Sequence, residues 1–284
     1  MYEPHKTQNQ DVVIHQPIVR CTYNDGMADG LVIGQVLDYY TETLRSHVKA
    51  QAFLQLRGLC HADLLTQFRL GFADRTLGLQ LHKLDYLQEE KVRGALQRAG
   101  LQKVSGHELF RGALVFPMFD QGGRILGGYG RRITPKLTSQ SAYHVHWRFE
   151  QSGFFNQKAV FEFPELILCK SPIEALTWWC HGYRNVVAIL GFAGFDDEHL
   201  SILQSSLVRL VYLAFGSSRP ELDEARRIAH LLTHNDIEVR FVLFPQGADS
   251  NAFVLTVSDP VKELSLLLRE SLVFPKKMGG EYDQ

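Results

Sequence analysis

The residues best placed for chemistry lie in four short loops in the second half of the chain. A lysine in such a loop can bind a phosphate as a point charge, whereas a serine there acts as a nucleophile only beside a base. No histidine accompanies Ser171, Ser217 or Ser218 in any motif, so we expect no serine nucleophile. The four loops are Lys170-Ser171, Gly191–Phe195, Gly216–Arg219 and Gln246–Asn251.

Three further groups of side chains have simpler interpretations. His144 and His146, beside Trp147, could ligate a metal, but no third ligand follows at a familiar spacing, so we interpret them as a histidine pair in a loop. The acidic run 196–198 stands at a helix start, where it complements the helix dipole. Trp178-Trp179 lies on a predicted helix and is expected to pack in the core.

The elements around the four loops alternate between strand and helix from residue 165 onward. Such alternation, with strands apolar enough to be covered on both faces, predicts a parallel sheet between helices. The loops that follow the strands then gather at the carboxyl edge of the sheet, where functional groups of such folds lie. The predicted strands are Leu166–Cys169, Val186–Leu190, Leu207–Phe215 and Ile237–Phe244, and the predicted helices are 172–182, 197–206 (capped by Asp196) and 221–234.

The first half of the chain has a different pattern. Apolar residues at helical spacing predict a helix over Val32–Leu56, with shorter helices near 62–68 and 84–98. Two apolar runs, Ala113–Phe119 and Arg124–Tyr129, flank a Gly-rich turn and predict a hairpin. The polar stretch 134–157 reads as irregular, and we place the domain boundary there.

Composition excludes several classes of protein. With 45% hydrophobic and 21% charged residues, the 284-residue chain has the composition of a globular protein, which argues against a disordered or fibrous one. Its four cysteines form no CxxC pair, which excludes a disulfide framework and a four-thiolate zinc site within the chain. No apolar run approaches a membrane span and the start does not read as a signal peptide, so we expect a cytoplasmic protein without membrane contact.

Charge is distributed unevenly along the chain, although the net charge is only −1. Residues 31–150 carry 16 basic and 10 acidic side chains, and residues 151–284 carry 12 and 17. A basic half beside an acidic half could indicate a module that binds polyanions. On charge alone, an uneven solvated surface is the simpler interpretation.

Several runs occur in a fixed order: AFLQLRGLCHADLLTQFRLGF (52–72), AGL (99–101), FRGALVFPMFDQGGRILGGYGRRI (110–133), LILCKSPIEAL (166–176), VYLAFGSSRPELDEARRIA (211–229) and LFPQGADSNAFV (243–254). Together they resemble the catalytic core of bacterial DnaG-type DNA primases. The amino-terminal part of that core reads YL..RGL, F.IGF and FR.R..FP..D..GR..GFGGR, and the TOPRIM domain after it carries EGxxD, DxD and G.DP motifs. The resemblance covers about residues 36–257 and is most specific over 52–133.

The resemblance implies a fold of class α/β: a mixed α+β amino-terminal primase-core subdomain followed by a TOPRIM-like parallel-sheet α/β domain. The first 35 residues hold one cysteine, so we expect the zinc-binding domain that usually precedes this core to be missing. The expected divisions are a flexible or partly ordered lead-in with a short strand near 11–19 (1–30), the primase-core-like subdomain (31–150), a degenerate TOPRIM-like domain (155–260), and a carboxyl-terminal helix and tail (261–284).

The residues at the TOPRIM motifs depart from the family pattern. In that family a Glu at the first strand end acts as acid or base, and Asp residues at a later strand end hold Mg²⁺, a hard cation that takes oxygen ligands. Only two acids, Glu174 and Asp249, remain at these positions. An ammonium in place of a carboxylate repels a cation, so we expect metal chemistry to be lost, with no metal site, no cofactor and no catalytic residue. The substituted positions are Lys170 and Ser171 in the first motif and Gly216 and Ser218 in the second.

Two roles are open for Lys170. It could bind a phosphate in the crevice, or it could form an ion pair with Glu174, one helical turn along the chain. We favour the ion pair, because perturbed charge pairs are often structural.

The arginines of the hairpin region match the family better. In the primases, basic residues at these positions line the template groove, and Arg can hold phosphate bidentately. The resemblance therefore implies nucleic-acid contact, although ordinary exposed strand charges would give the same residues. The candidates are Arg111, Arg124, Arg131 and Arg132, while the second Arg of the family's FR.R is Ala113 here.

The sequence thus favours a primase-like protein of DNA replication, from a mobile element or plasmid, that binds single-stranded or primed DNA or RNA. A replicative helicase, a polymerase or a zinc-domain subunit acting in trans are its candidate protein partners. One alternative is an active primer synthase that uses Mg²⁺ with Glu174, Asp249 and, as a further candidate, Asp223. The other is a protein–protein scaffold without nucleic-acid contact.

Overall fold

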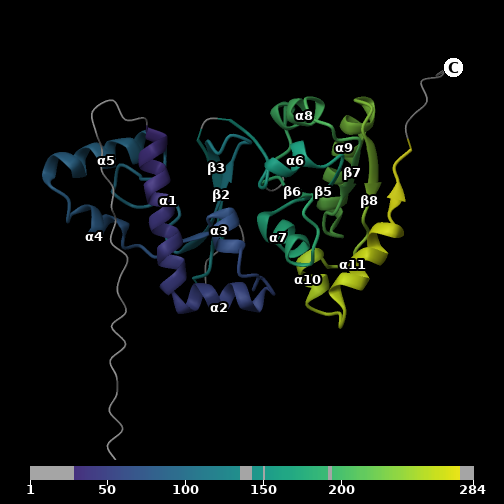
Figure 1. Cartoon of the computed structure of the whole chain (residues 1–284), viewed down its shortest axis with the longest axis horizontal. Helices are drawn as coiled ribbons and strands as arrows, with labels where there is room; N and C mark the ends of the chain where they lie inside the picture. The colour runs from purple at the N-terminus through teal and green to yellow at the C-terminus, as the bar shows by residue number, and fades with distance from the viewer. Residues whose placement is uncertain (1–28, 135–142, 150, 191–193, 276–284) are drawn as a thin grey trace, which may run out of the picture.

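The computed structural model describes residues 29–134, 143–149, 151–190 and 194–275. These residues form two units, the first up to residue 149 and the second from residue 151, which lie side by side along the longest axis of the molecule (Figure 1). The strand expected near 11–19 and the last nine residues of the predicted tail lie outside the described residues.

The first unit is built on an antiparallel sheet in the order β1-β2-β3-β4. Helices α1, α4 and α5 bury their apolar sides against one face of this sheet. The elements are α1 (Asp29–Ser46), α2 (Val48–Leu56), α3 (Leu64–Phe68), β1 (Gly71–Ala73), α4 (Leu77–Leu81), α5 (Tyr86–Arg98), β2 (Ala113–Phe119), β3 (Ile125–Arg132) and β4 (His144–Arg148).

The central strands of this sheet are covered on both faces. In β2, Ala113 and Val115 point toward α1 and α5, whereas Leu114 and Phe116 point toward the second unit. Successive side chains of a strand alternate between faces, so a strand buried on both sides must be apolar throughout. This explains the unbroken run ALVFPMF.

The second unit contains a five-stranded sheet in the order β6-β5-β7-β8-β9. The first four of these strands are parallel and β9 is antiparallel at the edge. The elements are α6 (Lys158–Glu162), β5 (Glu165–Cys169), α7 (Pro172–Cys180), β6 (Val186–Ala188), α8 (Asp197–Gln204), β7 (Leu210–Leu213), α9 (Arg219–His234), β8 (Glu238–Phe241), α10 (Ser250–Val254), α11 (Pro260–Arg269) and β9 (Leu272–Val273).

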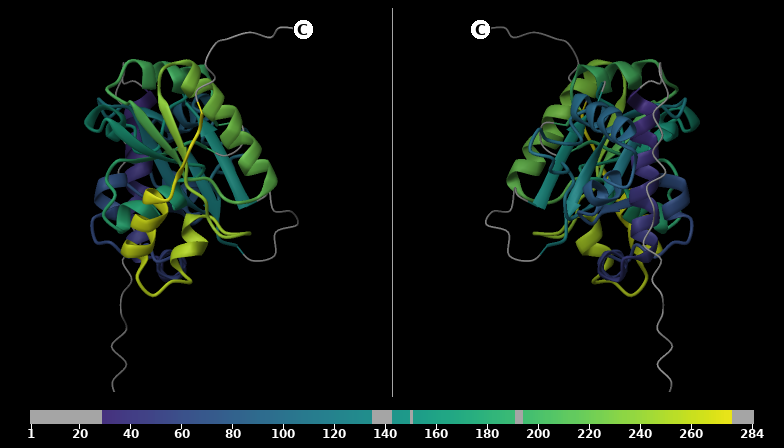
Figure 2. Two further views of the ribbon diagram at one scale, coloured as in Figure 1. Left: turned by 90° about the vertical axis from the view of Figure 1, so that its right-hand side faces the viewer. Right: turned by 90° about the vertical axis from the view of Figure 1, so that its left-hand side faces the viewer.

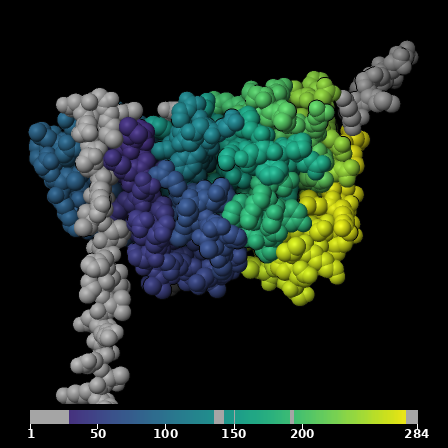
Figure 3. Space-filling model, in the orientation of Figure 1, coloured from purple at the N-terminus to yellow at the C-terminus, as the bar shows by residue number. Residues whose placement is uncertain are grey.

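One apolar cluster joins the two units. Phe68 of α3 contacts the Phe155 ring at 5.1 Å and the Trp179 ring at 5.2 Å between centroids. Phe116 and Tyr129 of the antiparallel sheet belong to the same cluster. In Figure 3 the blue atoms of the first unit meet the green atoms of the second along a continuous boundary, and in the end-on ribbon views of Figure 2 the two units overlap. The two units are therefore held together by buried rings.

The predicted fold class is confirmed, but two local expectations were wrong. The helix predicted over 32–56 is divided into α1 and α2 at His47, whose side chain accepts a hydrogen bond from the backbone N–H of Ala50 and so begins a new helix. The stretch 134–157, predicted to be irregular, contains β4, which pairs with β3. Its sequence HVHWR alternates exposed and buried residues, the period of a half-buried strand.

The strand–helix alternation predicted for the second half is confirmed, with shorter strands than expected. The strand expected over 207–215 spans only Leu210–Leu213, and the one over 237–244 spans Glu238–Phe241. Asp196 caps α8 as predicted, since its side chain accepts a hydrogen bond from the backbone N–H of His199. Among the described residues, no helix has the length and apolar character to cross a bilayer.

A close approach between α1 and β1 gives a stability prediction. A Cβ atom at Gly71 would lie 2.6 Å from the Cβ of Tyr40 and 3.0 Å from its carbonyl carbon. We expect Gly71→Ala to lower the free energy of unfolding by about 2 kcal/mol, because helix and strand must move apart. Urea denaturation measures this change.

Gly34→Ala is the matched control. Gly34 lies on α1, the helix that approaches Gly71, and a carbon added there has no atom within 4 Å. This control should stabilise the protein by about 0.5–1 kcal/mol through helix propensity. Equal stability of the two variants would contradict the close approach.

Candidate functional site

The candidate site lies where the order of strands reverses in the parallel sheet. The chain runs from β5 to β6 on one side and then crosses to β7 on the other side of β5. Lys170 follows the end of β5, and Gly216 follows the end of β7. Neighbouring parallel strands whose connections leave in opposite directions open a crevice at their carboxyl ends, where ligands of such folds bind.

The ammonium of Lys170 forms an ion pair with the carboxylate of Glu221, the third residue of α9. Both side chains are largely buried, with exposed fractions of 20% and 13%. The predicted pairing of Lys170 with Glu174 was therefore wrong. The Glu174 carboxyl instead accepts a hydrogen bond from the Ser171 hydroxyl at 2.7 Å, because Ser171 caps α7 and turns that carboxyl back toward itself.

The Glu221 carboxylate lies beside Gly216, in the loop that follows β7. This carboxylate accepts a hydrogen bond from the Ser218 hydroxyl at 2.6 Å. A Cβ atom at Gly216 would lie 2.5 Å from one of its oxygens. Burial acts to raise the pKa of Glu221, but hydrogen bonds from Lys170 and Ser218 and the lysine charge outweigh it, so the pKa lies below its ordinary value. The carboxylate is ionised, and a larger residue at 216 would displace it.

Glu174 is a buried acid with an incomplete set of partners. Its side chain is only 3% exposed, and its Oε2 has no hydrogen-bond partner in the described part of the chain. Burial first, and then the negative charge of Asp249, raise the pKa of Glu174 to about 8. Glu174 is therefore mostly protonated at neutral pH, which removes the repulsion between the two acids.

The two other candidate acids are engaged in local structure. The Asp249 carboxylate caps α10 by accepting a hydrogen bond from the backbone N–H of Ala252 at 2.7 Å. Asp223 is exposed on α9 and pairs with Arg226 at 3.0 Å. The structure thus brings Lys170, Glu174 and Asp249 together but leaves Asp223 outside the group.

The antiparallel sheet contributes a polar face to the same region. The Tyr129 hydroxyl lies 2.7 Å from Nδ1 of His144, and the Arg131 guanidinium donates to Nε2 of that histidine at 2.9 Å. Burial, followed by the charges of Arg131 and other nearby groups that include Lys170, lowers the pKa of His144 to about 4. His144 is neutral at pH 7, and the strand end and the sheet face are close enough to interact electrostatically.

The four predicted arginines do not form one group. Arg131 shares the face of Tyr129, whereas Arg132 points to the opposite face because strand neighbours alternate. Arg111 lies two residues before Ala113, the residue of β2 that pairs with Arg132. Arg124 lies in the turn at the other end of the hairpin, where it pairs with Asp120 at 2.6 Å. Arg131 lies seven positions further along the chain than Arg124, a distance of about 23 Å in an extended strand.

The sequence analysis missed Glu221 and Tyr129 and placed His144 in a loop. The spacing Ser218-x-x-Glu221 is a capping-box pattern that could have marked Glu221 at a helix start. No set of three or more His, Cys, Asp or Glu side chains placed to hold a metal ion occurs within the described ranges.

Comparison with known proteins identifies the relatives of this chain. Residues 39–144 match the family model of the DNA primase catalytic core, N-terminal domain. A DNA primase of Campylobacter jejuni is 25% identical over 224 residues, covering 74% of this chain and 36% of that protein. A DNA primase of Aquifex aeolicus is 26% identical over 234 residues, covering 79% and 46%. The chain thus corresponds to between a third and a half of these relatives.

Solved structures show the same fold over most of the chain. The crystal structure of the zinc-binding and RNA polymerase domains of Aquifex aeolicus primase superposes with a TM-score of 0.73 at 24% identity, covering 87% of this chain and 61% of that one. A DnaG primase catalytic domain bound to single-stranded DNA gives 0.71 at 18% identity, covering 86% and 79%. The resemblance to the DnaG-type catalytic core is confirmed, and residues 39–144 correspond to its N-terminal domain.

The protonation of Glu174 predicts a specific pH dependence of stability. A carboxyl whose pKa is raised on folding, here from 4.5 to about 8, holds its proton more tightly in the folded state, so stability falls as pH rises between these values. At pH 7 this costs roughly 3 kcal/mol, from about 1.4 kcal/mol for each pH unit. Glu174→Gln keeps the acceptor for Ser171 and removes the ionisation.

We therefore expect Glu174→Gln to unfold at higher urea concentration than the wild type at pH 7–8, and the two proteins to converge near pH 4.5. Denaturation curves at several pH values measure this difference. A variant less stable than the wild type at pH 8 would show that Glu174 is ionised in the folded protein.

Proposed function

We propose that this primase-like protein of DNA replication binds single-stranded or primed nucleic acid at the junction of its two units, and that its TOPRIM-like centre has lost metal-dependent nucleotide transfer. The observation that carries the proposal is the Lys170–Glu221 ion pair at the strand ends. An ammonium and its counter-ion stand where the family resemblance requires carboxylates for Mg²⁺.

The donor set at this place does not fit Mg²⁺. The ion requires several oxygen ligands in near-octahedral geometry. The Glu221 carboxylate is engaged by Lys170 and Ser218. The Glu174 carboxyl is protonated at neutral pH because its pKa is about 8. A divalent cation would have to displace the lysine and deprotonate this buried acid.

Binding of nucleic acid is supported by the basic and aromatic groups of the sheet face. Arg131 is held by His144 and lies 5.1 Å from the centre of the Tyr143 ring, so its guanidinium is oriented while still part of an exposed surface. An oriented guanidinium can hold a phosphate bidentately without reading sequence. One structural relative is a primase domain bound to single-stranded DNA, and we extend that ligand class to this chain.

The origin of the protein and its protein partners are inferred from the family resemblance alone. A mobile-element or plasmid origin, and a helicase, polymerase or zinc-domain subunit as protein partner, stay predictions. The active primer synthase remains testable, because nucleotide incorporation with Mg²⁺ or Mn²⁺ should then be lost in Glu174→Ala and Asp249→Ala. The scaffold alternative predicts no strand binding at any salt concentration.

The placement of the arginines predicts unequal effects on strand binding. We expect Arg131→Ala to weaken binding of a single-stranded oligonucleotide about tenfold, or about 1.4 kcal/mol, and to reduce the salt slope by about one. Arg124→Ala should change the affinity little, because Arg124 lies about 23 Å along the strand from Arg131 and is paired with Asp120. Fluorescence anisotropy at several salt concentrations measures both.

Arg131→Lys is a further control that keeps the charge and should retain most of the affinity. Absent or salt-independent binding by the wild type would favour the scaffold reading. Equal losses in the Arg131→Ala and Arg124→Ala variants would place the strand elsewhere on the molecule.

The ion pair predicts how a metal site could be installed. The triple variant Lys170→Glu/Gly216→Asp/Glu221→Gly removes the ammonium, clears the space beside residue 216 and supplies two carboxylates. We expect Mg²⁺ to bind this variant but not the wild type in calorimetric titration, with a gain of thermal stability at millimolar Mg²⁺. Lys170→Gln/Glu221→Gln, which removes the pair without adding carboxylates, should stay unresponsive.

The opposite result has a clear meaning. Submillimolar Mg²⁺ binding by the wild type, abolished in Glu174→Gln, would restore the active-enzyme alternative.

A further inference from the structure

A cavity of about 590 Å³ opens beside the candidate site and is not used by it. It lies between the antiparallel sheet and the second unit, where Leu190 and Asp196 line it, at the same carboxyl edge of the parallel sheet as Lys170. Its volume is within the range of small-molecule sites. The lining residues used below are Met118, Leu126, His146, Gln151, Leu190 and Asp196.

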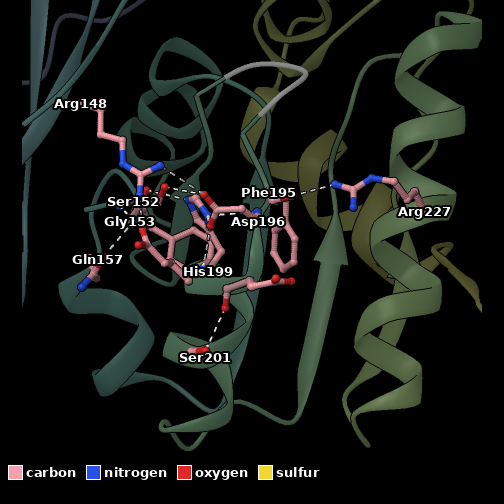
Figure 4. Close-up of polar contacts among 12 residues, drawn as sticks. Arg148, Ser152, Gly153, Gln157, Phe195, Asp196, His199, Ser201 and Arg227 are labelled. Carbon is pink, nitrogen blue, oxygen red and sulfur yellow. Dashed lines mark hydrogen bonds and ion pairs between the residues drawn. The ribbon is translucent and has the colours of Figure 1, made fainter. Parts of the chain in front are cut away.

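One wall of the cavity is held by a network of polar contacts (Figure 4). The Asp196 carboxylate contacts the buried His199 ring at 2.6 Å and accepts from the Ser152 hydroxyl at 2.5 Å. The other nitrogen of His199 lies 2.9 Å from the Gly153 carbonyl oxygen. Arg148 donates to Glu198 at 2.8 Å. Because these groups are already bonded to one another, the wall is preformed.

The remaining walls combine an apolar slot with two available polar side chains. Met118, Leu126 and Leu190 supply flat apolar surface. Within the described residues, neither His146 nor Gln151 has a hydrogen-bond partner in the fold. Burial lowers the pKa of His146, so its ring is neutral at pH 7 and offers one donor and one acceptor. The Gln151 amide offers the same pair.

This combination fits a nucleobase. A base is flat and apolar on its faces, and its edge carries adjacent donors and acceptors that an amide or imidazole can match. Proteins that bind single strands place unstacked bases in slots of this kind while basic groups hold the backbone.

The cavity is also placed correctly relative to the phosphate-binding surface. His144 and His146 lie on one face of β4, two residues or about 7 Å apart. His144 contacts Arg131, whereas His146 lines the cavity. Tyr129 contacts both rings, with centroids at 5.8 and 5.6 Å. A nucleotide whose base enters the cavity can therefore direct its phosphate toward Arg131.

We propose that this cavity binds a single nucleobase, with His146 and Gln151 meeting its edge and with the attached phosphate directed toward Arg131. The proposal deepens and rests on the proposed function, because it supplies a second contact for the same strand. It adds a base-binding subsite that is separate from the Lys170–Glu221 pair.

A methionine methyl group provides a direct probe. Of the four methionines in the chain, Met118 lies in the described part, and it lines the cavity. With methyl-¹³C methionine, adenosine 5′-monophosphate should shift the Met118 resonance in a saturable manner through the ring current of the base. Ribose 5-phosphate, which has the phosphate but no base, should leave that resonance in place. Met118→Leu assigns the signal.

Two substitutions test the site itself. Leu190→Trp fills the slot, and we expect it to weaken the nucleotide response at least tenfold. Leu207→Trp, at a residue that is 69% exposed and outside the cavity, is the matched control and should leave the response unchanged. Gln151→Ala should reduce the affinity for the nucleotide several-fold. Because Gln151 is exposed, this substitution does not disturb the packing of the core.

The outcomes separate this proposal from the proposed function. No shift of Met118 at 10 mM nucleotide, or an equal shift with ribose 5-phosphate, overturns the base subsite, while salt-dependent strand binding sensitive to Arg131→Ala would still support the proposed function. A saturable shift of the Met118 resonance that Leu190→Trp abolishes supports the base subsite, even if the protein binds no strand and the proposed function is wrong.

Discussion

The ion pair between Lys170 and Glu221 fixes the arrangement of the strand ends on which the candidate site depends. It joins the end of β5 to the first turn of α9 across 51 positions of sequence. The carboxylate also fills the space that a side chain at residue 216 would need. Partly buried charges are stable only when paired, so each member of the pair requires the other.

The apolar cluster between the units determines what faces this ion pair. Phe68 packs against both Phe155 and Trp179 across the junction. Their packing presents the face of β3 and β4 that carries Arg131 and His144 to the carboxyl edge of the parallel sheet. Side-chain alternation then assigns Arg132 to the other face. The site therefore combines charge from one unit with a polar, aromatic surface from the other.

Features set by short stretches of sequence could be predicted, whereas those set by tertiary contact could not. The Asp196 cap and the hairpin turn 120–123 depend on a few adjacent residues, and both were predicted correctly. The partner of Lys170 depends on how β5 and α9 are placed, so proximity along the chain suggested Glu174 instead. The strand that carries His144 was overlooked because the polar stretch around it obscured a five-residue alternation.

The position of the Glu221 carboxylate beside Gly216 determines how substitutions at the two strand ends affect one another. Lys170→Glu alone would set two acids against each other without a counter-ion. A side chain added at 216 alone would collide with Glu221, and removal of Glu221 alone would leave a buried ammonium unbalanced. Each of these single substitutions is therefore expected to lower the stability of the fold on its own. Coupling of this kind means that the three positions can change without loss of stability only when they change together.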